Sequence, residues 1–247
     1  MAHIDVLDDD FSLSNPTLVE GMPGAGLVGK IATDHLVEVL DMDHLANVHC
    51  DSLPPVALYG DEDPTLKTPV RLFVDAERDL LALRSDVPVP TEAAVEFADC
   101  LADYYAEWDV TPLYISGLPT EKDARPPALH GVASGRGASL LSEADIEIPV
   151  ETGLISGPTG ALLGDAVERD LTAVGLIVET DAQFPDPEAA RVLIREGLEP
   201  LTGLSVPTEE LVGRAEEIRE AKEDLARRLH EGESEETTQA RPLRMYH

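Results

Sequence analysis

Short apolar stretches alternate along this chain with longer segments in which apolar residues recur every three or four positions. The first pattern predicts buried strands, and the second predicts helices that pack one face on a sheet. The predicted strands are residues 17–20, 44–50, 70–76, 79–85, 113–116, 131–133 and 171–179. The predicted helices are residues 26–40, 91–108, 161–169, 187–201 and 208–230, with Thr91 as the expected cap of the second.

Strands that are apolar throughout and separated by helices are typical of a parallel sheet covered on both faces. Residues 70–76 and 79–85 follow each other closely enough to predict a hairpin, which would make the sheet mixed. We therefore expect an α/β protein, a three-layer α/β/α sandwich with a mostly parallel mixed sheet. Residues 1–205 are predicted to form this domain, because no change of composition divides them.

A long C-terminal helix is predicted to follow the domain, over residues 206–230. Its apolar residues step by four and three and form a heptad seam that contains one lysine. The seam consists of Leu211, Ala215, Ile218, Lys222, Leu225 and Leu229. This pattern fits an oligomer contact whose register Lys222 limits, and it equally fits packing on the chain's own domain.

The last segment, residues 231–247, is predicted to be a disordered tail. Residues 231–244 read EGESEETTQARPLR, which buries too little apolar surface to offset the entropy of ordering. Met245, Tyr246 and His247 then place an apolar residue and a tyrosine next to a carboxylate. Such an end is typical of a peptide that docks in a partner's pocket, and the alternative is a frayed end of accidental composition.

Charge sets this chain apart from an ordinary globular protein. It has 18 Lys and Arg against 49 Asp and Glu, a net charge of −31, and the acids are dispersed. Molar salt would screen the resulting self-repulsion, so a halophile's cytosol is the simplest interpretation. A nucleic-acid mimic or a cation buffer, the alternatives, would cluster its charge. Nucleic acid is not an expected partner, because its phosphates would meet charge of their own sign.

Membrane and secreted classes are not expected either. No apolar run approaches the length of a membrane span, and no signal peptide precedes the acidic start MAHIDVLDDD. Cys50 and Cys100 are isolated and lack CxxC spacing, so we expect reduced thiols and a cytoplasmic protein.

A glycine-rich loop, residues 21–30, resembles two nucleotide-binding motifs without completing either. Gly24, Gly26 and Gly29 match G-x-G-x-x-G, but three residues separate the strand from the first of these glycines. Gly24 and Gly29-Lys30 also fall one residue short of a P-loop. The residue after Lys30 is an isoleucine, where that motif needs a metal-binding hydroxyl. The simpler interpretation is that these glycines permit a sharp turn and close packing of the helix on the sheet.

A second loop, in LISGPTGALL (residues 154–163), repeats the layout of strand, Gly-Pro turn and helix. Both loops follow strands, at the edge where an open α/β sheet holds its ligand. The candidate ligand-loop residues are Gly21, Gly24, Gly26, Gly29, Lys30, Gly157, Pro158, Thr159 and Gly160. Ser116, Ser156 and Thr159 have no evident partner base, and the seven histidines lack metal-ligand spacing. We therefore predict no catalytic residues, no metal site and no cofactor.

The opening LVEGMPGAGLVGKIATDHLVEVL and the later SGPTGALL resemble the archaeal branch of the proteasome-assembly-chaperone family. The resemblance covers roughly residues 15–205. It implies a nucleoside-phosphorylase-like α/β/α domain, no established enzymatic activity, and self-assembly into a homo-oligomer. The final Met245-Tyr246-His247 is similar to the hydrophobic-tyrosine-any tail of proteasome-docking proteins.

The resemblance implies a partner, the α-subunits of the 20S proteasome, and a role for each tail residue. Met245 would enter an apolar part of an intersubunit pocket, Tyr246 would pack and hydrogen-bond, and the carboxylate of His247 would pair with a lysine. The expected function is assembly chaperoning or ATP-independent activation of the proteasome. The alternative is a phosphorylase-like or hydrolase-like enzyme that binds a phosphate or nucleoside between the two glycine loops.

Overall fold

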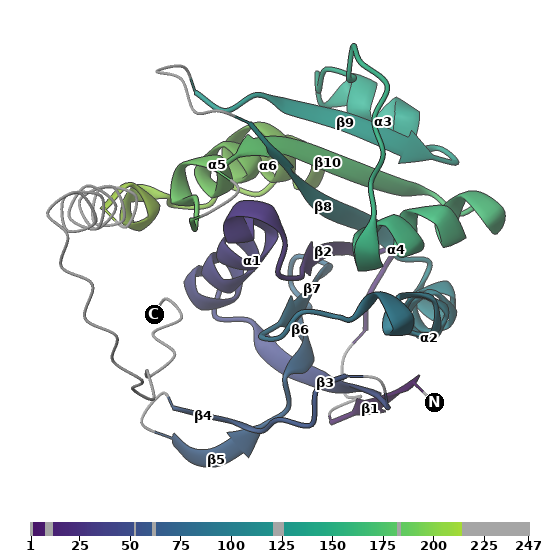
Figure 1. Ribbon diagram of the computed structural model, residues 1–247, viewed down its shortest axis with the longest axis vertical. Coiled ribbons are helices and arrows are strands. Elements are labelled where there is room, and N and C mark those ends of the chain that lie inside the picture. Colours follow the sequence, from purple (N-terminus) through teal and green to yellow (C-terminus); the bar gives the residue numbers. More distant parts are fainter. Residues whose placement is uncertain are drawn as a thin grey trace, which may run out of the picture.

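The computed structural model describes residues 2–7, 12–51, 53–60, 63–120, 126–181 and 184–213. Within these residues one large sheet carries helices on both sides (Figure 1). Its strands are β1 (Ala2–Val6), β2 (Thr17–Gly21), β3 (Asp43–Cys50), β6 (Val70–Asp75), β7 (Leu80–Ser85), β8 (Thr111–Pro119), β9 (Leu129–Ser134) and β10 (Ala173–Thr180). Their order across the sheet is β1-β3-β6-β7-β2-β8-β10-β9. A separate hairpin pairs β4 (Leu58–Gly60) with β5 (Asp63–Lys67).

Parallel pairing is confined to the centre of this sheet, where β7, β2, β8 and β10 lie side by side. The sheet is mixed, as predicted, but the prediction of a mostly parallel sheet was wrong. Among the described strands, the pairs β1–β3, β3–β6, β6–β7 and β10–β9 are all antiparallel. On one side of the sheet the β6–β7 hairpin is followed by β3 and then β1. β1 was not predicted because polar His3 and Asp5 alternate with its other residues, so it has no continuous apolar stretch.

Helices cover both faces of the sheet, because successive residues of its central strands belong to two different cores. In β7, Leu80 and Ala82 join one core, whereas Leu81 and Leu83 join the other. The first core includes α1 (Val28–Val39) and α5 (Pro187–Val192). The π-helical residues Leu193–Leu198 continue α5 and belong to the same core, and α6 (Glu199–Thr202) follows them and packs against it. The second core includes α2 (Ala94–Trp108) and α4 (Gly157–Glu168). A short helix, α3 (Gly137–Glu143), packs beside β9.

The predicted capping role of Thr91 was wrong. A 3₁₀ turn, Thr91–Ala93, precedes α2. The residues at the N-cap positions are Pro90 for the turn and Ala93 for α2, and neither makes a side-chain capping hydrogen bond. Pro90 occupies the capping position in an extended conformation (φ −61°, ψ 149°), so Thr91 already lies inside the turn. The 3₁₀ turn and α2 together span the predicted helix, and β6–β7 form the predicted hairpin.

The C-terminal part of the chain lies mostly outside the described residues. Residues 209–213 are helical, and Leu211, the first residue of the predicted seam, is fully buried in the core beside α1. That residue packs on the chain's own domain. The rest of the seam and the tail with Met245, Tyr246 and His247 lie beyond residue 213 and outside the described residues.

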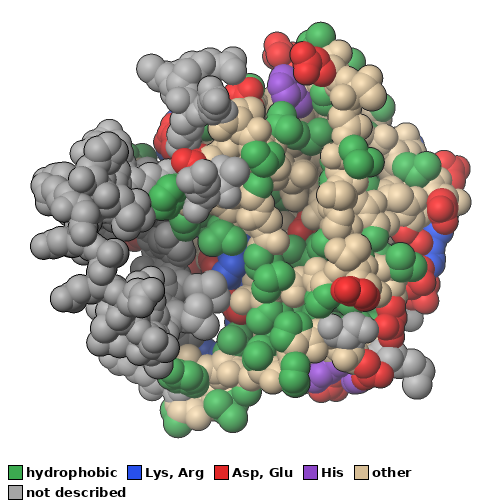
Figure 2. Space-filling view, viewed as in Figure 1, with side chains coloured by type: hydrophobic (Ala, Val, Ile, Leu, Met, Phe, Trp, Pro, Cys, Tyr) green, Lys and Arg blue, Asp and Glu red, His purple; other side chains and the backbone are tan. Residues whose placement is uncertain are grey.

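Two general properties bear on function. Figure 2 shows acidic side chains spread around the visible face, as the dispersed sequence pattern predicts. No helix in the described part of the chain is long and apolar enough to cross a membrane.

Candidate functional site

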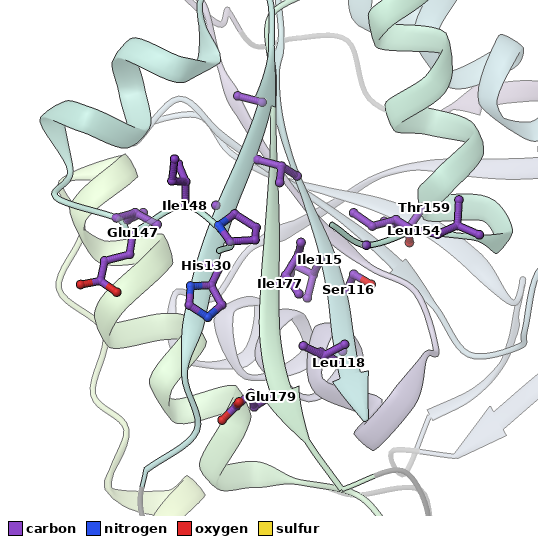
Figure 3. A pocket seen from close by; sticks show the side chains of 18 of the residues that line it. Ile115, Ser116, Leu118, His130, Glu147, Ile148, Leu154, Thr159, Ile177 and Glu179 are labelled. Atoms are coloured by element: carbon purple, nitrogen blue, oxygen red, sulfur yellow. The ribbon is translucent and has the colours of Figure 1, made fainter. Parts of the chain in front are cut away.

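The two glycine loops form walls of one cavity. Its volume is about 1460 Å³, and it lies beyond the end of β2, between α4 and the strands β8, β10 and β9 (Figure 3). Of the candidate loop residues, Gly24, Pro158 and Thr159 line it. The remaining candidates do not appear in its lining: Gly21, Gly26, Gly29, Lys30, Gly157 and Gly160.

The glycines of the first loop allow α1 to approach the sheet. Gly26 has a φ of +63°, and a Cβ there would lie 1.9 Å from the hydroxyl of Thr180. A Cβ on Gly21 would lie 2.4 Å from Thr33, and one on Gly29 would press on the carbonyl of Glu20 at 3.3 Å. Gly24 alone in this loop has nothing within 4 Å of its Cβ position, and it faces the cavity. The packing interpretation of this loop therefore accounts for three of its four glycines.

The second loop turns sharply into α4, but the strand predicted before it was wrong, because residues 152–156 form no strand and lead from α3. Gly157 has a φ of +70°, a conformation that favours glycine, and Pro158 follows in the first turn, where its missing N–H costs nothing. A Cβ on Gly160 would lie 2.4 Å from the carbonyl oxygen of Ile155, so this glycine also serves close packing. Thr159 is buried, and its hydroxyl points to the end of β2.

A buried carboxyl group, Glu20, connects both loops with β8. Its oxygens accept hydrogen bonds from the backbone N–H of Met22 at 3.1 Å and of Ile115 at 3.1 Å, and from the hydroxyl of Thr159 at 3.2 Å. Burial raises the pKa of Glu20 to about 7, although these three hydrogen bonds lower it. Glu20 therefore holds the first loop, the second loop and β8 together beneath the cavity.

Lys30 takes part in a buried ion cluster away from the cavity. Its Nζ lies 2.8 Å from Asp34 Oδ2 and 2.8 Å from Asp86 Oδ1. Arg71 pairs with Asp86 at 2.5 Å, and Arg84 Nε lies 2.8 Å from Asp34 Oδ1. Burial acts to raise the pKa of Asp86, but the charges of Lys30, Arg84 and Arg71 outweigh it and hold that pKa below its usual range. Lys30 therefore has a structural role in this cluster, and its ammonium group does not face the cavity as a phosphate-binding lysine would.

The charge of the cavity lining is one-sided. It contains Asp145, Glu147, Glu151 and Glu179, and no lysine or arginine among the described residues. Such a lining does not suit a phosphate. No cluster of three His, Cys, Asp or Glu in the described part of the chain could hold a metal ion.

Several lining residues were not singled out from the sequence. His130 comes from β9, and its Nδ1 is buried without a hydrogen-bond partner in the described structure. Residues 145–156, which we call the strap, join α3 to α4 and border the cavity. The sequence pattern that could have indicated the strap is the alternation of apolar Ile146, Ile148 and Val150 with other residues. Ser116 and Ser156, which were considered as nucleophiles, also line the cavity.

Comparison with known proteins identifies relatives over nearly the whole chain. The structure is similar to that of Pyrococcus furiosus PbaA, an archaeal homolog of proteasome-assembly chaperone, with a TM-score of 0.77 and 26% identity over 93% of this chain and 94% of that one. It is also similar to P. furiosus PbaB, an archaeal proteasome activator, with a TM-score of 0.77 and 22% identity over 93% of this chain and 98% of that one. The Methanocaldococcus jannaschii protein MJ0106 is 26% identical over 222 residues, 86% of each chain. The PAC2 family model matches residues 18–226, and the chain therefore belongs to the PAC2 family.

Proposed function

We propose that this protein is a proteasome assembly chaperone or an ATP-independent activator that docks on the α-ring of the 20S proteasome through its C-terminal tail. The observation that carries the proposal is membership of the PAC2 family together with the likeness to PbaA. The sequence Met245-Tyr246-His247 adds the docking element. We propose a cytoplasmic homo-oligomer from a salt-rich cell, with no enzymatic step and no cofactor.

The proposed mechanism is insertion of the tail between neighbouring α-subunits. Met245 fills an apolar part of the pocket, Tyr246 packs and hydrogen-bonds, and the terminal carboxylate of His247 pairs with a lysine. A random-coil linker of about 14 residues spans about 20 Å, enough to reach a pocket beneath a docked body. Several tails on one oligomer would bind far more tightly than one tail alone.

The same proposal includes the finer architecture, a three-layer α/β/α sandwich of the nucleoside-phosphorylase-like kind. The support is that α1 and α5 pack in one core and α2 and α4 in the other, on opposite faces of the sheet. This kinship concerns the fold, and function has to be argued from the site.

One observation favours the alternative, a phosphorylase-like or hydrolase-like enzyme. Gly24 and Thr159, from the two glycine loops, line the same cavity. The carboxylates of the lining oppose a phosphate ligand, and Lys30 is engaged by Asp34 and Asp86. A saturable thermal shift with phosphate, nucleosides or nucleotides, abolished by Thr159→Val, would favour the enzyme over the chaperone.

The proposal is tested by capture of archaeal 20S particles and isolated α-rings in molar KCl. Full-length protein is compared with a variant that lacks Met245, Tyr246 and His247. We expect capture by the full-length protein and none by the truncated one, with the oligomer and its unfolding unchanged. Preference for α-rings over finished particles would assign assembly, and preference for particles would assign activation. Equal capture by both forms would overturn docking through the tail.

A further inference from the structure

The floor of the cavity is a part of the sheet face that α4 leaves uncovered. Ser116 in β8 and His130 in β9 both stand opposite Ile177 in β10, so these three side chains share one face. Leu118 follows two residues after Ser116 on that same face. Figure 3 shows these residues between Glu147 and Ile148 of the strap on one side and Leu154, near the end of the strap, on the other.

The rim of the cavity exposes large apolar side chains. Along the strap, Ile148 is 70% exposed, Val150 97% and Leu154 92%, and Leu118 on the floor is 44% exposed. All four line the cavity. Scattered apolar residues on a surface need no explanation, but a group around one groove marks an interaction site.

The first glycine loop borders the groove at the end of β8. β2 pairs with β8 only over Thr17–Val19 and Thr111–Leu113, after which the N–H of Ile115 donates to the Glu20 side chain. Beyond that point the 3₁₀ turn Ala25–Leu27 packs against β8, and a Cβ on Gly117 would lie 2.5 Å from the carbonyl oxygen of Ala25. The groove therefore lies over the face of the sheet, above Ser116, Leu118 and Ile177.

The size of the groove argues against a small metabolite. Sites for small molecules usually measure about 300–1,000 Å³ and bury most of the ligand. This cavity measures about 1460 Å³, and its rim is open to solvent at Val150 and Leu154. Both properties suit a stretch of polypeptide.

The charges define the kind of polypeptide. Ile177 and Leu118 of the floor supply the apolar middle, while the only charged lining residues in the described structure are the carboxylates of Asp145, Glu147, Glu151 and Glu179. Figure 3 shows Glu147 to one side of Ile177 and Glu179 below it. An apolar centre with a charged rim is the usual anatomy of a protein interface.

We propose that this cavity is a docking groove for an extended segment of another protein, with apolar side chains in its middle and lysine or arginine at its flanks. The segment lies along the floor of the groove. Its apolar side chains rest on Ile177, Leu118 and the exposed apolar residues of the strap, and its basic side chains meet the carboxylates of the rim. Glu20 and Thr159 hold the two loops in place, so the groove exists before the segment arrives. This site is separate from the C-terminal tail and extends the proposed function with a second contact to a protein partner.

The test begins with full-length protein applied in KCl solution to an array of random ten-residue peptides. We expect the retained peptides to be enriched in Val, Ile, Leu, Lys and Arg and depleted in Asp and Glu. Retention of no peptide, or of acidic peptides, would overturn the proposal. The best peptide is then labelled, and its dissociation constant is measured by fluorescence anisotropy.

Two matched variants separate the groove from the rest of the surface. Leu154→Asp changes an exposed residue of the rim, and Val167→Asp changes a residue of α4 that is 67% exposed and is not part of the lining. We expect Leu154→Asp to weaken binding at least about tenfold, because the segment loses its apolar contact with this leucine and its apolar middle would desolvate a carboxylate instead. Val167→Asp should leave binding unchanged. Equal affinity for Leu154→Asp and wild type would overturn the groove as the site.

A second copy of this chain is the competing occupant, and sedimentation velocity distinguishes it. If wild type binds no peptide and Leu154→Asp dissociates an oligomer that wild type forms, the groove is an interface between copies and the proposal is overturned. We expect the same sedimentation for both proteins.

Discussion

Replacing Glu20 by glutamine should change how the stability of this protein depends on pH. The side chain is 1% exposed, and its two oxygens accept hydrogen bonds from Met22, Ile115 and Thr159. Glutamine keeps nearly the same shape, and it cannot lose a proton. The difference between the two proteins therefore isolates the titration of one buried carboxyl group.

The size of the effect follows from the shift in pKa. Burial raises the pKa of Glu20 from its ordinary value of 4.5 to about 7 in the folded protein. Between these two values the folded state binds more protons than the unfolded state, so the free energy of unfolding falls as the pH rises. The stabilising contribution is complete below pH 4.5 and is lost as the pH rises through about 7. At about 1.4 kcal/mol for each pH unit, the whole loss is about 3 kcal/mol.

The assay is urea unfolding at a series of pH values from 4.5 to 8.5, at one KCl and one protein concentration. The single tryptophan, Trp108, lies at the end of α2 and reports unfolding by its fluorescence. We expect the stability of wild type, measured relative to Glu20→Gln, to fall by about 3 kcal/mol across this range. The other carboxyl groups contribute equally to both proteins and cancel in the difference.

A second variant tests the cause of the shift. The hydrogen bond from Thr159 lowers the pKa of Glu20, so Thr159→Val should raise that pKa further and move the pH dependence upward. A difference between wild type and Glu20→Gln that stays constant from pH 4.5 to 8.5 would refute the account of Glu20 as a buried group with a raised pKa.

Two further predictions concern close packing and buried charge, and the same unfolding assay tests both. Gly26→Ala should lower the free energy of unfolding by at least about 1–3 kcal/mol, because φ at this position is +63° and the new Cβ would collide with Thr180. Gly24→Ala, whose Cβ would enter open space, should change it by less than about 0.5 kcal/mol. Equal effects would contradict the packing role of Gly26. Asp86→Asn should cost about 3–5 kcal/mol by leaving buried Lys30 and Arg71 without that partner, whereas Asp103→Asn, which breaks the exposed pair with Arg169, should cost less than about 1 kcal/mol. An Asp86 variant as stable as wild type would show that the cluster is not a significant source of stability.

The central elements of the fold could be predicted because the spacing of apolar residues within each segment indicates which side chains are buried. The hairpin β6–β7 and the helix α2 lie where apolar spacing indicated them. β1 was missed because this edge strand is only partly buried and carries His3 and Asp5. Its pairing with β3, and with it the largely antiparallel side of the sheet, depends on contacts between distant residues.

The candidate site was predicted in position but not in chemistry. The sequence indicated that the two glycine loops would meet because each was predicted to follow a strand, and Gly24 and Thr159 do line one cavity. The strand predicted before the second loop is absent, since residues 152–156 form no strand. Glu20 could be read only as the end of a strand, since its burial depends on Thr159 and Ile115, far away in the chain. The destination of Lys30 likewise depends on Asp86, 56 residues further along.

The most direct test of the proposed docking is competition by a peptide with the sequence RPLRMYH, residues 241–247. Full-length protein is bound to immobilised archaeal 20S proteasome in molar KCl, and its release is measured as the peptide concentration rises. We predict release at about millimolar peptide, and none with a peptide carrying alanine in place of Tyr246. Full-length protein that stays bound at every concentration, while the form lacking Met245, Tyr246 and His247 binds as tightly, would contradict docking through the tail.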